Sequence, residues 1–465
     1  MNNIGILSIL PAAIAILLAF ITKDAIIALF VASLLGFFFI GGALWDYPGF
    51  LIETIANDSF AWVFYIEIQI GILIALFQLS DVPNIFSAIA QRKKMTRRKG
   101  QIYAWLAGMC VFFSDYFSPV FVGTSLQPIT DKVKISREKL AYIADSTSSP
   151  LIVIIPFTSW ALYISGIIGD QSPSLSSSEA IGVFASSIIY NFYAILSVIF
   201  VGLISFGVIK DFGPMRKAED RAFEQGKLVR DGSTPMIGEE IKELKKPAGA
   251  SSSFTLNFLI PVTLIIGINV TTYIAIGGVK IVESFSAALL YLFITMSLQK
   301  FGTKQLSKAV VSGVKAVIPA VLILLFAYAL NSITKDAGAA NYLVSISEGL
   351  ITPNLLPAII FFVAAVISFS TGTSWGTFAI TIPIALAMSM ELTGSMYHPL
   401  VFMSIAAATG GGVFGDHCSP LSDTSVLASI GAGSDHMDHI RTQFPYALAV
   451  AFVSFIFYLA AGYIL

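Results

Sequence analysis

The sequence has little charge for its length. Asp, Glu, Lys and Arg make up only 12% of its 465 residues, whereas soluble domains carry about 25%. Hydrophobic residues make up 56% of the chain, and its mean hydropathy is +0.82. This composition excludes an ordinary soluble domain. It predicts an all-α protein that crosses a lipid bilayer several times.

Cysteine and net charge are also scarce. Cys110 and Cys418 both lie in apolar segments, so we expect neither a disulfide framework nor a cysteine metal motif. A net charge of −1 gives no reason to expect a nucleic-acid partner, and we interpret the basic cluster at 92–99 as a topology anchor beside lipid phosphates. No basic segment or cleavage site precedes Lys23, so the apolar run from Ile4 is expected to be a retained first helix.

Twelve apolar stretches carry the predicted topology. A helix needs about 20 residues to cross the hydrocarbon. The predicted full spans, about ten, are 4–22, 25–45, 60–80, 141–166, 181–209, 254–276, 284–299, 310–332, 400–428 and 444–464. Two further stretches, 102–130 and 355–391, carry Pro, Gly and hydroxyl clusters near their middles. We interpret both as re-entrant helical hairpins, whose tips must be buried in protein or line a watery cavity.

The distribution of basic residues agrees with this topology. We place the amino terminus outside and let each hairpin return to its own side of the membrane. All 27 Lys and Arg residues except Lys280 and Lys335 then fall in the cytoplasm, as the positive-inside rule requires. Counting either hairpin as a full span would invert everything that follows it.

The order of elements predicts two inverted repeats. Residues 1–209 contain three spans, an amphipathic stretch (82–100), a hairpin, a broken span and a final span. Residues 254–465 repeat this order with the amphipathic stretch at 333–354, and their hairpin enters from the opposite side. Inverted repeats with discontinuous helices are a recurrent transporter plan. The mixed-charge segment 210–253 is expected to be a solvated cytoplasmic linker with one or two surface helices.

Acid and hydroxyl groups interrupt the predicted spans 141–166 and 400–428. An aspartate at the centre of a membrane helix costs about 2.5–3.5 kcal/mol on insertion scales, so these residues are expected to serve a function. Unwound carbonyls, hydroxyls and carboxylates coordinate Na⁺ in transporters. We therefore predict Na⁺ sites near Asp145 and near Asp416 and Asp423. Isolated hydroxyls elsewhere are expected only to bond to carbonyls of their own helix.

The candidate ligands fall into two sets, each a hairpin with the broken span of the same half. The first set is Asp115, Ser118, Thr124, Ser125, Asp145, Ser146, Thr147 and Ser148. The second set is Thr371, Gly372, Thr373, Ser374, Asp416, Ser419, Ser422, Asp423 and Thr424.

Protons are the second candidate ion. Asp416 and Asp423 are seven residues apart and would share a helix face, so they are expected to titrate as a coupled pair. A carboxylate that holds either Na⁺ or a proton makes an exchanger by competition. His417 is expected to be either a proton relay or a structural hydrogen-bond donor. Glu67, the remaining acid inside a span, is either a relay or a hydrogen-bond partner of Gln69 or of a neighbouring helix.

Two further patterns in the sequence, a His/Asp cluster and a G-x-S-x-G match, have simpler interpretations than a metal site or a hydrolase. His436, Asp438 and His439 are expected at the cytoplasmic surface, and we interpret them as solvated residues rather than a metal site. Gly372–Gly376 matches G-x-S-x-G, with His417 as a conceivable base for an intramembrane hydrolase. The nucleophile elbow needs a strand before its serine, whereas this match lies in an apolar helical hairpin. We therefore expect that the protein is not an enzyme and that it uses no organic cofactor.

One family signature is visible. Gly411–Thr424, with its Gly-Asp-His-Cys-Ser-Pro run, resembles the signature of the NhaC-type sodium/proton antiporters, as do Ser114–Phe117 and Ala144–Thr147. The resemblance covers nearly the whole chain. It implies a multi-pass protein of the bacterial inner (plasma) membrane, coupled to Na⁺, with inverted repeats and re-entrant hairpins. It also implies an elevator-like movement against a scaffold, and a homodimer formed through scaffold helices.

Two functions stay open at this point. The first is a Na⁺/H⁺ antiporter that works by alternating access. The alternative is a Na⁺-coupled carrier or exchanger of a small organic acid or amino acid, as in malate–lactate exchange, because relatives of the family include such carriers. The predicted inverted repeat disfavours a passive channel.

Overall fold

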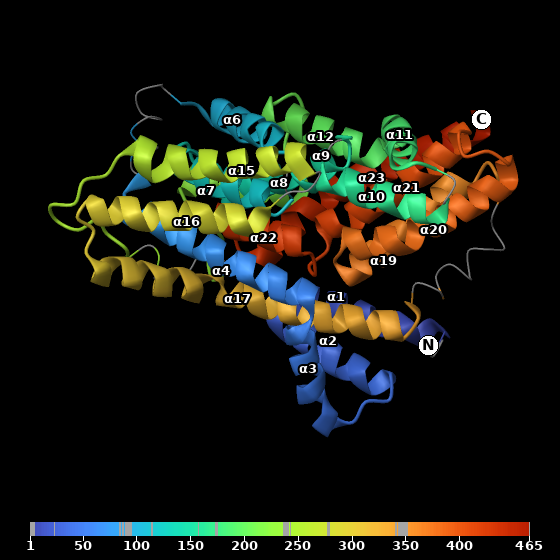
Figure 1. The fold of residues 1–465 in the computed structure, drawn as a ribbon, viewed down its shortest axis with the longest axis horizontal. Helices are drawn as coiled ribbons and strands as arrows, with labels where there is room; N and C mark the ends of the chain where they lie inside the picture. Colours follow the sequence, from blue (N-terminus) through green and yellow to red (C-terminus); the bar gives the residue numbers. More distant parts are fainter. Residues whose placement is uncertain are drawn as a thin grey trace.

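The computed structural model describes most of residues 5–464. The residues it leaves out within this range are 23, 83–84, 86–87, 89–94, 113–114, 157, 173–174, 236–240, 242, 277–279, 340–341 and 343–351. Within the described residues the regular structure is helical, and the only β feature is an isolated bridge between Pro235 and Asp435. Figure 1 shows most of the helices running side by side along the longest axis.

The helices of the first part of the chain are α1 (Leu10–Thr22), α2 (Ala25–Phe39), α3 (Tyr47–Ala56), α4 (Asp58–Leu79), α6 (Arg97–Cys110), α7 (Phe117–Lys132), α8 (Arg137–Ser146), α9 (Ser149–Ile152), α10 (Ser159–Gln171), α11 (Ser177–Ser187) and α12 (Phe192–Ser205). Those of the second part are α13 (Gly213–Gln225), α15 (Ile260–Ile276), α16 (Ile281–Leu298), α17 (Thr303–Asp336), α19 (Leu356–Thr371), α20 (Ser374–Thr393), α21 (Pro399–Cys418), α22 (Asp423–Ala432) and α23 (His436–Ile464). Short 3-10 or π turns lie at Gly5–Ser8, Leu44–Asp46, Ile188–Tyr190 and Thr255–Leu259.

Six of the described helices are long and apolar enough to cross a membrane: α4, α15 with the turn before it, α16, α17, α20 and α23. The chain is therefore a multi-pass membrane protein. The apolar segments of α1, α2 and α19 are shorter. Of the two helices in the second predicted hairpin, α19 and α20, the second is by itself long enough to cross the membrane. The predicted count of about ten spans and the two hairpins therefore stay predictions. The predicted single span 181–209 is bent by 53° between Tyr190 and Phe192.

The helices form two groups by their contacts. The scaffold helices are α1–α4 and α15–α17, in which α17 packs on α2 and α4, and α15 packs on α16. The site helices are α6–α12 and α19–α23, centred on α21, which packs on α19, α20 and α23. The main links between the groups are α17 with α22, and α1 and α17 with α19. Figure 1 shows α4, α16 and α17 side by side along one edge.

The contacts of one half of the chain recur in the other. α6 packs on α7, α8 and α12, and α19 packs on α20, α21 and α23. α7 packs on α22 as α20 packs on α10, and α12 packs on α21 as α23 packs on α8. In the scaffold, α2 packs on α17 as α16 packs on α4. In the order of the chain, α2, α4, α6, α7, α8, α10 and α12 correspond to α16, α17, α19, α20, α21, α22 and α23. When each helix is exchanged with its counterpart, this set of contacts stays the same, as a repeat would require. Its inverted orientation stays a prediction.

The segment after α12 contains a surface helix, α13, most of whose residues are exposed, and ion pairs attach this segment to the site helices. Arg221 of α13 binds the buried carboxylate of Glu138 at 2.8 Å and 2.9 Å. Arg230 binds Asp438 at 2.9 Å through its Nε atom. These pairs join the linker to the beginnings of α8 and α23, where a largely desolvated ion pair contributes more than an exposed one.

The scaffold is closed by a crossing of two glycines. A Cβ atom at Gly71 of α4 would lie 2.4 Å from the carbonyl oxygen of Gly313, and one at Gly313 of α17 would lie 2.4 Å from that of Gly71. The two backbones are therefore in direct contact, as small residues permit in membrane helices.

We expect Gly71→Ala to destabilise the protein by about 1–3 kcal/mol, because the added methyl group meets backbone that cannot move aside. The control is Gly267→Ala in α15, where a Cβ atom meets nothing within 4 Å and helix propensity favours alanine by about 1 kcal/mol. Thermal unfolding in detergent measures both. Equal melting temperatures for the two variants would contradict the crossing.

Candidate ion-binding site

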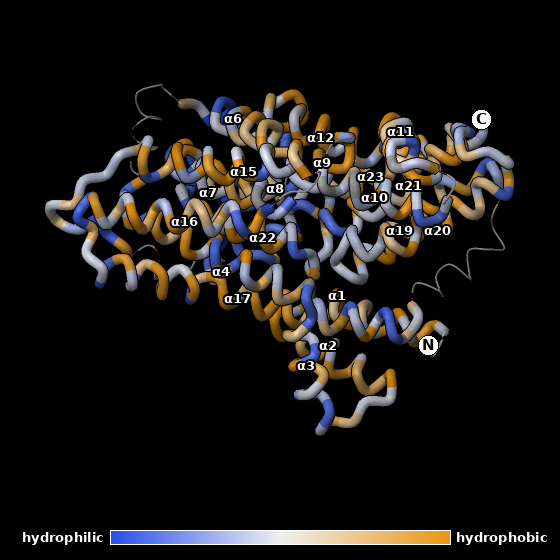
Figure 2. The backbone as a smooth tube through the Cα atoms, viewed as in Figure 1, coloured by the Kyte–Doolittle hydropathy of each residue, from blue (hydrophilic) through white to orange (hydrophobic). Residues whose placement is uncertain are grey.

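The predicted breaks are present in the structure. α8 ends at Ser146 and α9 begins at Ser149, followed by Pro150, while α21 ends just before Ser419 and Pro420. Proline lacks an amide hydrogen, and it disfavours the helical conformation of the residue before it. The Oγ atom of Ser422 then caps α22 by accepting from the Ser425 amide at 3.2 Å. Figure 2 shows hydrophilic stretches beside α22, in the middle of the molecule, between apolar helices.

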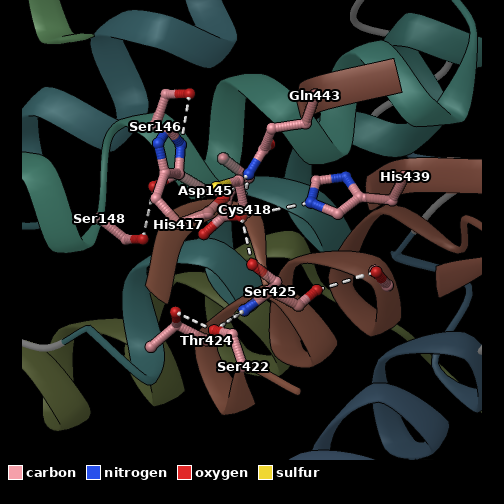
Figure 3. Close-up of polar contacts among 12 residues, drawn as sticks. Asp145, Ser146, Ser148, His417, Cys418, Ser422, Thr424, Ser425, His439 and Gln443 are labelled. Carbon is pink, nitrogen blue, oxygen red and sulfur yellow. Dashed lines mark hydrogen bonds and ion pairs between the residues drawn. The ribbon is translucent and has the colours of Figure 1, made fainter. Parts of the chain in front are cut away.

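Asp145 is the centre of the first cluster, and its side chain is fully buried. Its Oδ2 atom accepts from Ser425 Oγ at 2.9 Å, Gln443 Nε2 at 2.7 Å and His439 Nε2 at 3.2 Å. These donors lie on α22 and α23 and surround Asp145 in Figure 3. Its Oδ1 atom has no hydrogen-bond partner among the described residues. One carboxylate oxygen is thus held by three donors, and the other has none among the described residues.

His417 links the second break to the first half of the chain. Its Nε2 atom lies 2.9 Å from Ser146 Oγ, and its Nδ1 atom lies 2.8 Å from the Tyr193 hydroxyl. Gln443 donates to the His417 carbonyl as well as to Asp145. Both ring nitrogens of His417 are therefore within hydrogen-bonding distance of a hydroxyl, an arrangement that either predicted role allows, and Figure 3 shows its ring beside Ser146.

Asp416 and Asp423 form a second cluster with different donors. Asp416 Oδ2 accepts from Ser374 Oγ at 2.8 Å, and Asp416 Oδ1 has no partner in the described part of the chain. Asp423 Oδ2 accepts from the Tyr116 hydroxyl at 2.9 Å, and Asp423 Oδ1 accepts from the Thr424 amide at 2.8 Å. One acid is thus held from the second predicted hairpin and the other from the first.

Asp115 is held by one tryptophan from each half of the chain. Its Oδ2 atom accepts from Trp160 Nε1 at 3.2 Å and from Trp375 Nε1 at 3.4 Å. The two predicted ligand sets, one for each half, are therefore regrouped. Asp145 takes its donors from the second half, and Asp423 takes a side-chain donor from the first.

Several of the predicted hydroxyl ligands bond to nearby carbonyls. Thr124 bonds to Val120, Thr147 to Ile143, Ser148 to Asp145, Thr371 to Ile367, and Ser419 to Phe369. The hydroxyls of Ser422 and Thr424 lie 3.0 Å apart. The Thr373 carbonyl accepts from Thr377 Oγ1 at 2.8 Å. By contrast, the buried hydroxyls of Ser118 and Ser125 have no partner among the described residues.

The turn between α19 and α20 is held close to the second break. Gly372 has φ of +69°, and a Cβ atom there would lie 2.5 Å from the Leu421 carbonyl. Only glycine adopts this conformation readily. Ser374, which follows the turn, donates to Asp416 and to the Gly412 carbonyl, while both ring nitrogens of His417 are engaged elsewhere. The described contacts therefore give Ser374 no histidine base.

A cavity of about 650 Å³ separates part of the scaffold from the site helices. Trp62 and Tyr328 line its scaffold side, and Tyr116, Trp375 and Asp423 line the opposite side. The second cluster thus reaches a space large enough for solvent or a small molecule, whereas the Asp145 cluster is enclosed.

Sequence reasoning missed three donors to Asp145 and misplaced one segment. His436 and His439 are buried, which corrects their expected surface position. His439 binds Asp145, and His436 Nε2 lies 3.0 Å from the Pro420 carbonyl. The available signal was the spacing of His439 and Gln443, which are four residues apart and share one face of α23.

Glu67 is buried in α4, and neither of its carboxylate oxygens has a partner among the described residues. The alternative hydrogen bond to Gln69 is not made, because the Gln69 amide donates to Val282 O at 3.2 Å and Ser286 Oγ at 2.6 Å. Glu67 is therefore a buried acid of the scaffold whose carboxylate has no hydrogen-bond partner among the described residues.

The donor chemistry fits a monovalent hard cation better than a transition metal. No group of three or more His, Cys, Asp or Glu residues that could hold a metal occurs within the described ranges. The unpartnered buried atoms around the two clusters include carboxylate oxygens of Asp145 and Asp416, hydroxyl oxygens of Ser118 and Ser125, and the amide oxygen of Gln443; His439 Nδ1 is an unpartnered nitrogen beside them. Oxygen ligands of this kind hold Na⁺ in transporters.

The fold and the paired acids in broken helices define a secondary transporter. The model of the Na⁺/H⁺ antiporter family matches residues 151–463, and the chain therefore belongs to this family. An uncharacterised protein of Haemophilus influenzae is 31% identical over 98% of this chain and 91% of its own length. The malate-2H⁺/Na⁺-lactate antiporter of Bacillus subtilis is 31% identical over 35% of this chain and 34% of its own. An uncharacterised Na⁺/H⁺ antiporter of Haemophilus influenzae is 32% identical over 28% and 27%.

We expect Ser425→Ala to lower the free energy of unfolding by about 1.5–3 kcal/mol, because it removes a donor to a buried carboxylate. The matched control is Ser454→Ala, since Ser454 is equally buried and bonds only to the Val450 carbonyl; that change should cost less. Thermal unfolding in detergent at neutral pH compares them. A control as damaging as Ser425→Ala would argue against a charged Asp145.

Proposed function

We propose that the protein exchanges Na⁺ for protons across the bacterial inner membrane by alternating access. The observation that carries this proposal is the pair of half-satisfied buried carboxylates, Asp145 and Asp416, in facing helix breaks. An unpaired buried charge is costly, so such a carboxylate is expected to hold either a proton or Na⁺. Because one ion must leave before the other binds, competition couples the two fluxes.

The ligands in this proposal come from both halves. At the first site, Asp145 is supported by Ser425, Ser146 and the freed carbonyls of the first break. At the second site, Asp416 and Asp423 are supported by Ser374 and the turn at Gly372. Thr371, Thr373, Ser419, Ser422 and Thr424 would contribute backbone or hydroxyl oxygens, as Thr147 and Ser148 would at the first. Asp115 and Glu67 are candidates for carrying the proton.

The proposed movement displaces the site helices against the scaffold. It is supported by the recurrent contact pattern of the two halves, by the few links between the two groups, and by the cavity between them. In this proposal the repeats are inverted, α6–α7 and α19–α20 are re-entrant hairpins, and the amino terminus lies outside. Two copies are proposed to pair through the outer faces of α15 and α16, where Leu290 and Ile294 are exposed.

Exchange of a small organic solute is the second candidate function. The cavity favours it, because about 650 Å³ lies within the usual range of small-molecule sites and far exceeds one Na⁺ ion. The named activity of the Bacillus subtilis relative is also of this kind. In proteoliposomes, collapse of an imposed pH gradient by Na⁺ without any organic solute supports the antiporter. Strict dependence on an added solute supports the carrier.

We expect Asp416→Asn to abolish Na⁺-driven proton movement, because the amide can neither release a proton nor neutralise Na⁺. A pH-sensitive dye inside proteoliposomes measures the initial rate. Glu391→Gln is the control, since Glu391 is an exposed acid of α20, and it should exchange at the wild-type rate. Exchange by Asp416→Asn at that rate would remove Asp416 from the mechanism.

The topology predicts opposite accessibility for two exposed positions. In a background with Cys110→Ser, a membrane-impermeant thiol reagent added to intact cells should label Trp45→Cys and leave Lys217→Cys unlabelled. Both side chains are exposed in the structure. A difference in labelling between the two positions would therefore come from the side of the membrane on which each one lies. Inverted membrane vesicles should reverse the result. Labelling of Lys217→Cys in intact cells would refute an external amino terminus.

A further inference from the structure

The cavity between scaffold and site helices has a strongly biased lining. It contains five aromatic side chains, Trp62, Tyr116, Tyr163, Tyr328 and Trp375, drawn from both groups of helices. Aromatic rings concentrated around a space of this size are typical of small-molecule sites rather than of a water path.

The charge of the lining has one sign. Asp58 and Asp423 are its charged residues, and none of its 14 described lining residues is Lys, Arg or His. Asp115 lies behind the aromatic wall and accepts from the indole of Trp375. An organic anion would meet carboxylates here with no basic partner. A cation would meet complementary charge on two sides.

The aromatic rings are fixed in position by their own contacts. Trp62 packs edge-on against Tyr116 with ring centroids 5.3 Å apart, and Tyr163 packs against Trp375 at 4.7 Å. Tyr163 also donates to the Trp375 carbonyl at 3.2 Å. These contacts reduce the entropy that the rings would lose on binding a ligand. Faces of Trp and Tyr rings attract organic cations.

We infer that this cavity binds a small organic ammonium ion, as a transported solute or as a competitor of Na⁺ at Asp423. The ammonium group would lie between the aromatic faces of Trp62, Tyr163 and Trp375 and the Asp423 carboxylate. This inference rests on the proposed function, because it places the solute beside the second cluster. It goes further by fixing the charge of the solute, which the organic-acid alternative would make negative.

Three probes of equal chain length separate charge from size: n-pentylammonium, 1-pentanol and pentanoate, each at pH 7 and fixed Na⁺. Binding to the purified protein is followed by tryptophan fluorescence and by the rise in melting temperature that a ligand of the folded state produces. Tetraethylammonium is a fourth probe, which carries a positive charge but has no proton to release. A response to it therefore reports binding of a cation and not a change of pH caused by the amine. We expect n-pentylammonium to bind at least about tenfold more tightly than the other two pentyl probes, a difference of about 1.4 kcal/mol.

Paired variants test the aromatic contribution. Trp62→Leu and Tyr163→Leu should weaken n-pentylammonium binding by about 2- to 30-fold, which is the range of single cation–π contacts. Trp62→Phe and Tyr163→Phe keep a ring and should stay within about twofold of wild type. Size-exclusion profiles and melting temperatures without ligand identify variants that fail to fold, and the Phe variants keep the test informative in that case.

Each outcome decides the inference. Selective cation binding that falls in the Leu variants supports it. Equal binding of all three pentyl probes, tighter binding of pentanoate, or no binding overturns it. Na⁺-driven proton exchange by wild-type protein without amine keeps the proposed function even when no probe binds. Binding of n-pentylammonium by a protein that shows no Na⁺-driven proton exchange would contradict the antiporter proposal but would still support the cation site in the cavity.

Discussion

The structure depends on one constraint, the cost of keeping carboxylates inside a bundle of apolar helices. At Asp145 that cost is offset by three donors to a single oxygen, all from the opposite half of the chain. Among the described residues, the first half supplies no donor to the Asp145 side chain, so this acid is stabilised only when both halves have assembled. The other Asp145 oxygen has no donor among the described residues, and the same constraint is the reason for proposing an ion there.

Breaks in helices need room, and glycine provides it. A Cβ atom at Gly108 of α6 would lie 1.9 Å from Thr147 Oγ1, and one at Gly123 of α7 would lie 2.3 Å from the Gly431 backbone in α22. Thr147 of the first break is therefore packed against the bare backbone of α6, and the backbones of α7 and α22 touch directly. Close packing of this kind buries polar groups in protein rather than lipid and holds the site helices together.

The sequence predicted where the helices break but not which residues meet there. Asp, Ser and Pro mark the breaks at Ser146–Ser149 and Cys418–Ser422 locally, because proline and hydroxyl groups act on their own stretch of chain. The donors to Asp145 were missed because they lie about 280–298 residues away, and local pattern carries no such distance. His439 looked like a surface residue because it is polar, whereas its partner buries it. The ion pairs of the linker were not predicted for the same reason, since they join distant segments.

The two groups of helices differ in how they meet. Within each group, backbones touch at glycines, as at Gly71 and Gly313. Between the groups lies a cavity walled by aromatic rings and acids. A close-packed contact has few alternative arrangements, whereas a partly hollow one can shift without opening a new void. Displacement is therefore cheapest at the boundary that Asp423 faces, so the proposed ion site lies at the proposed moving surface. Any cation that fills the cavity would hold this boundary in one position until it leaves.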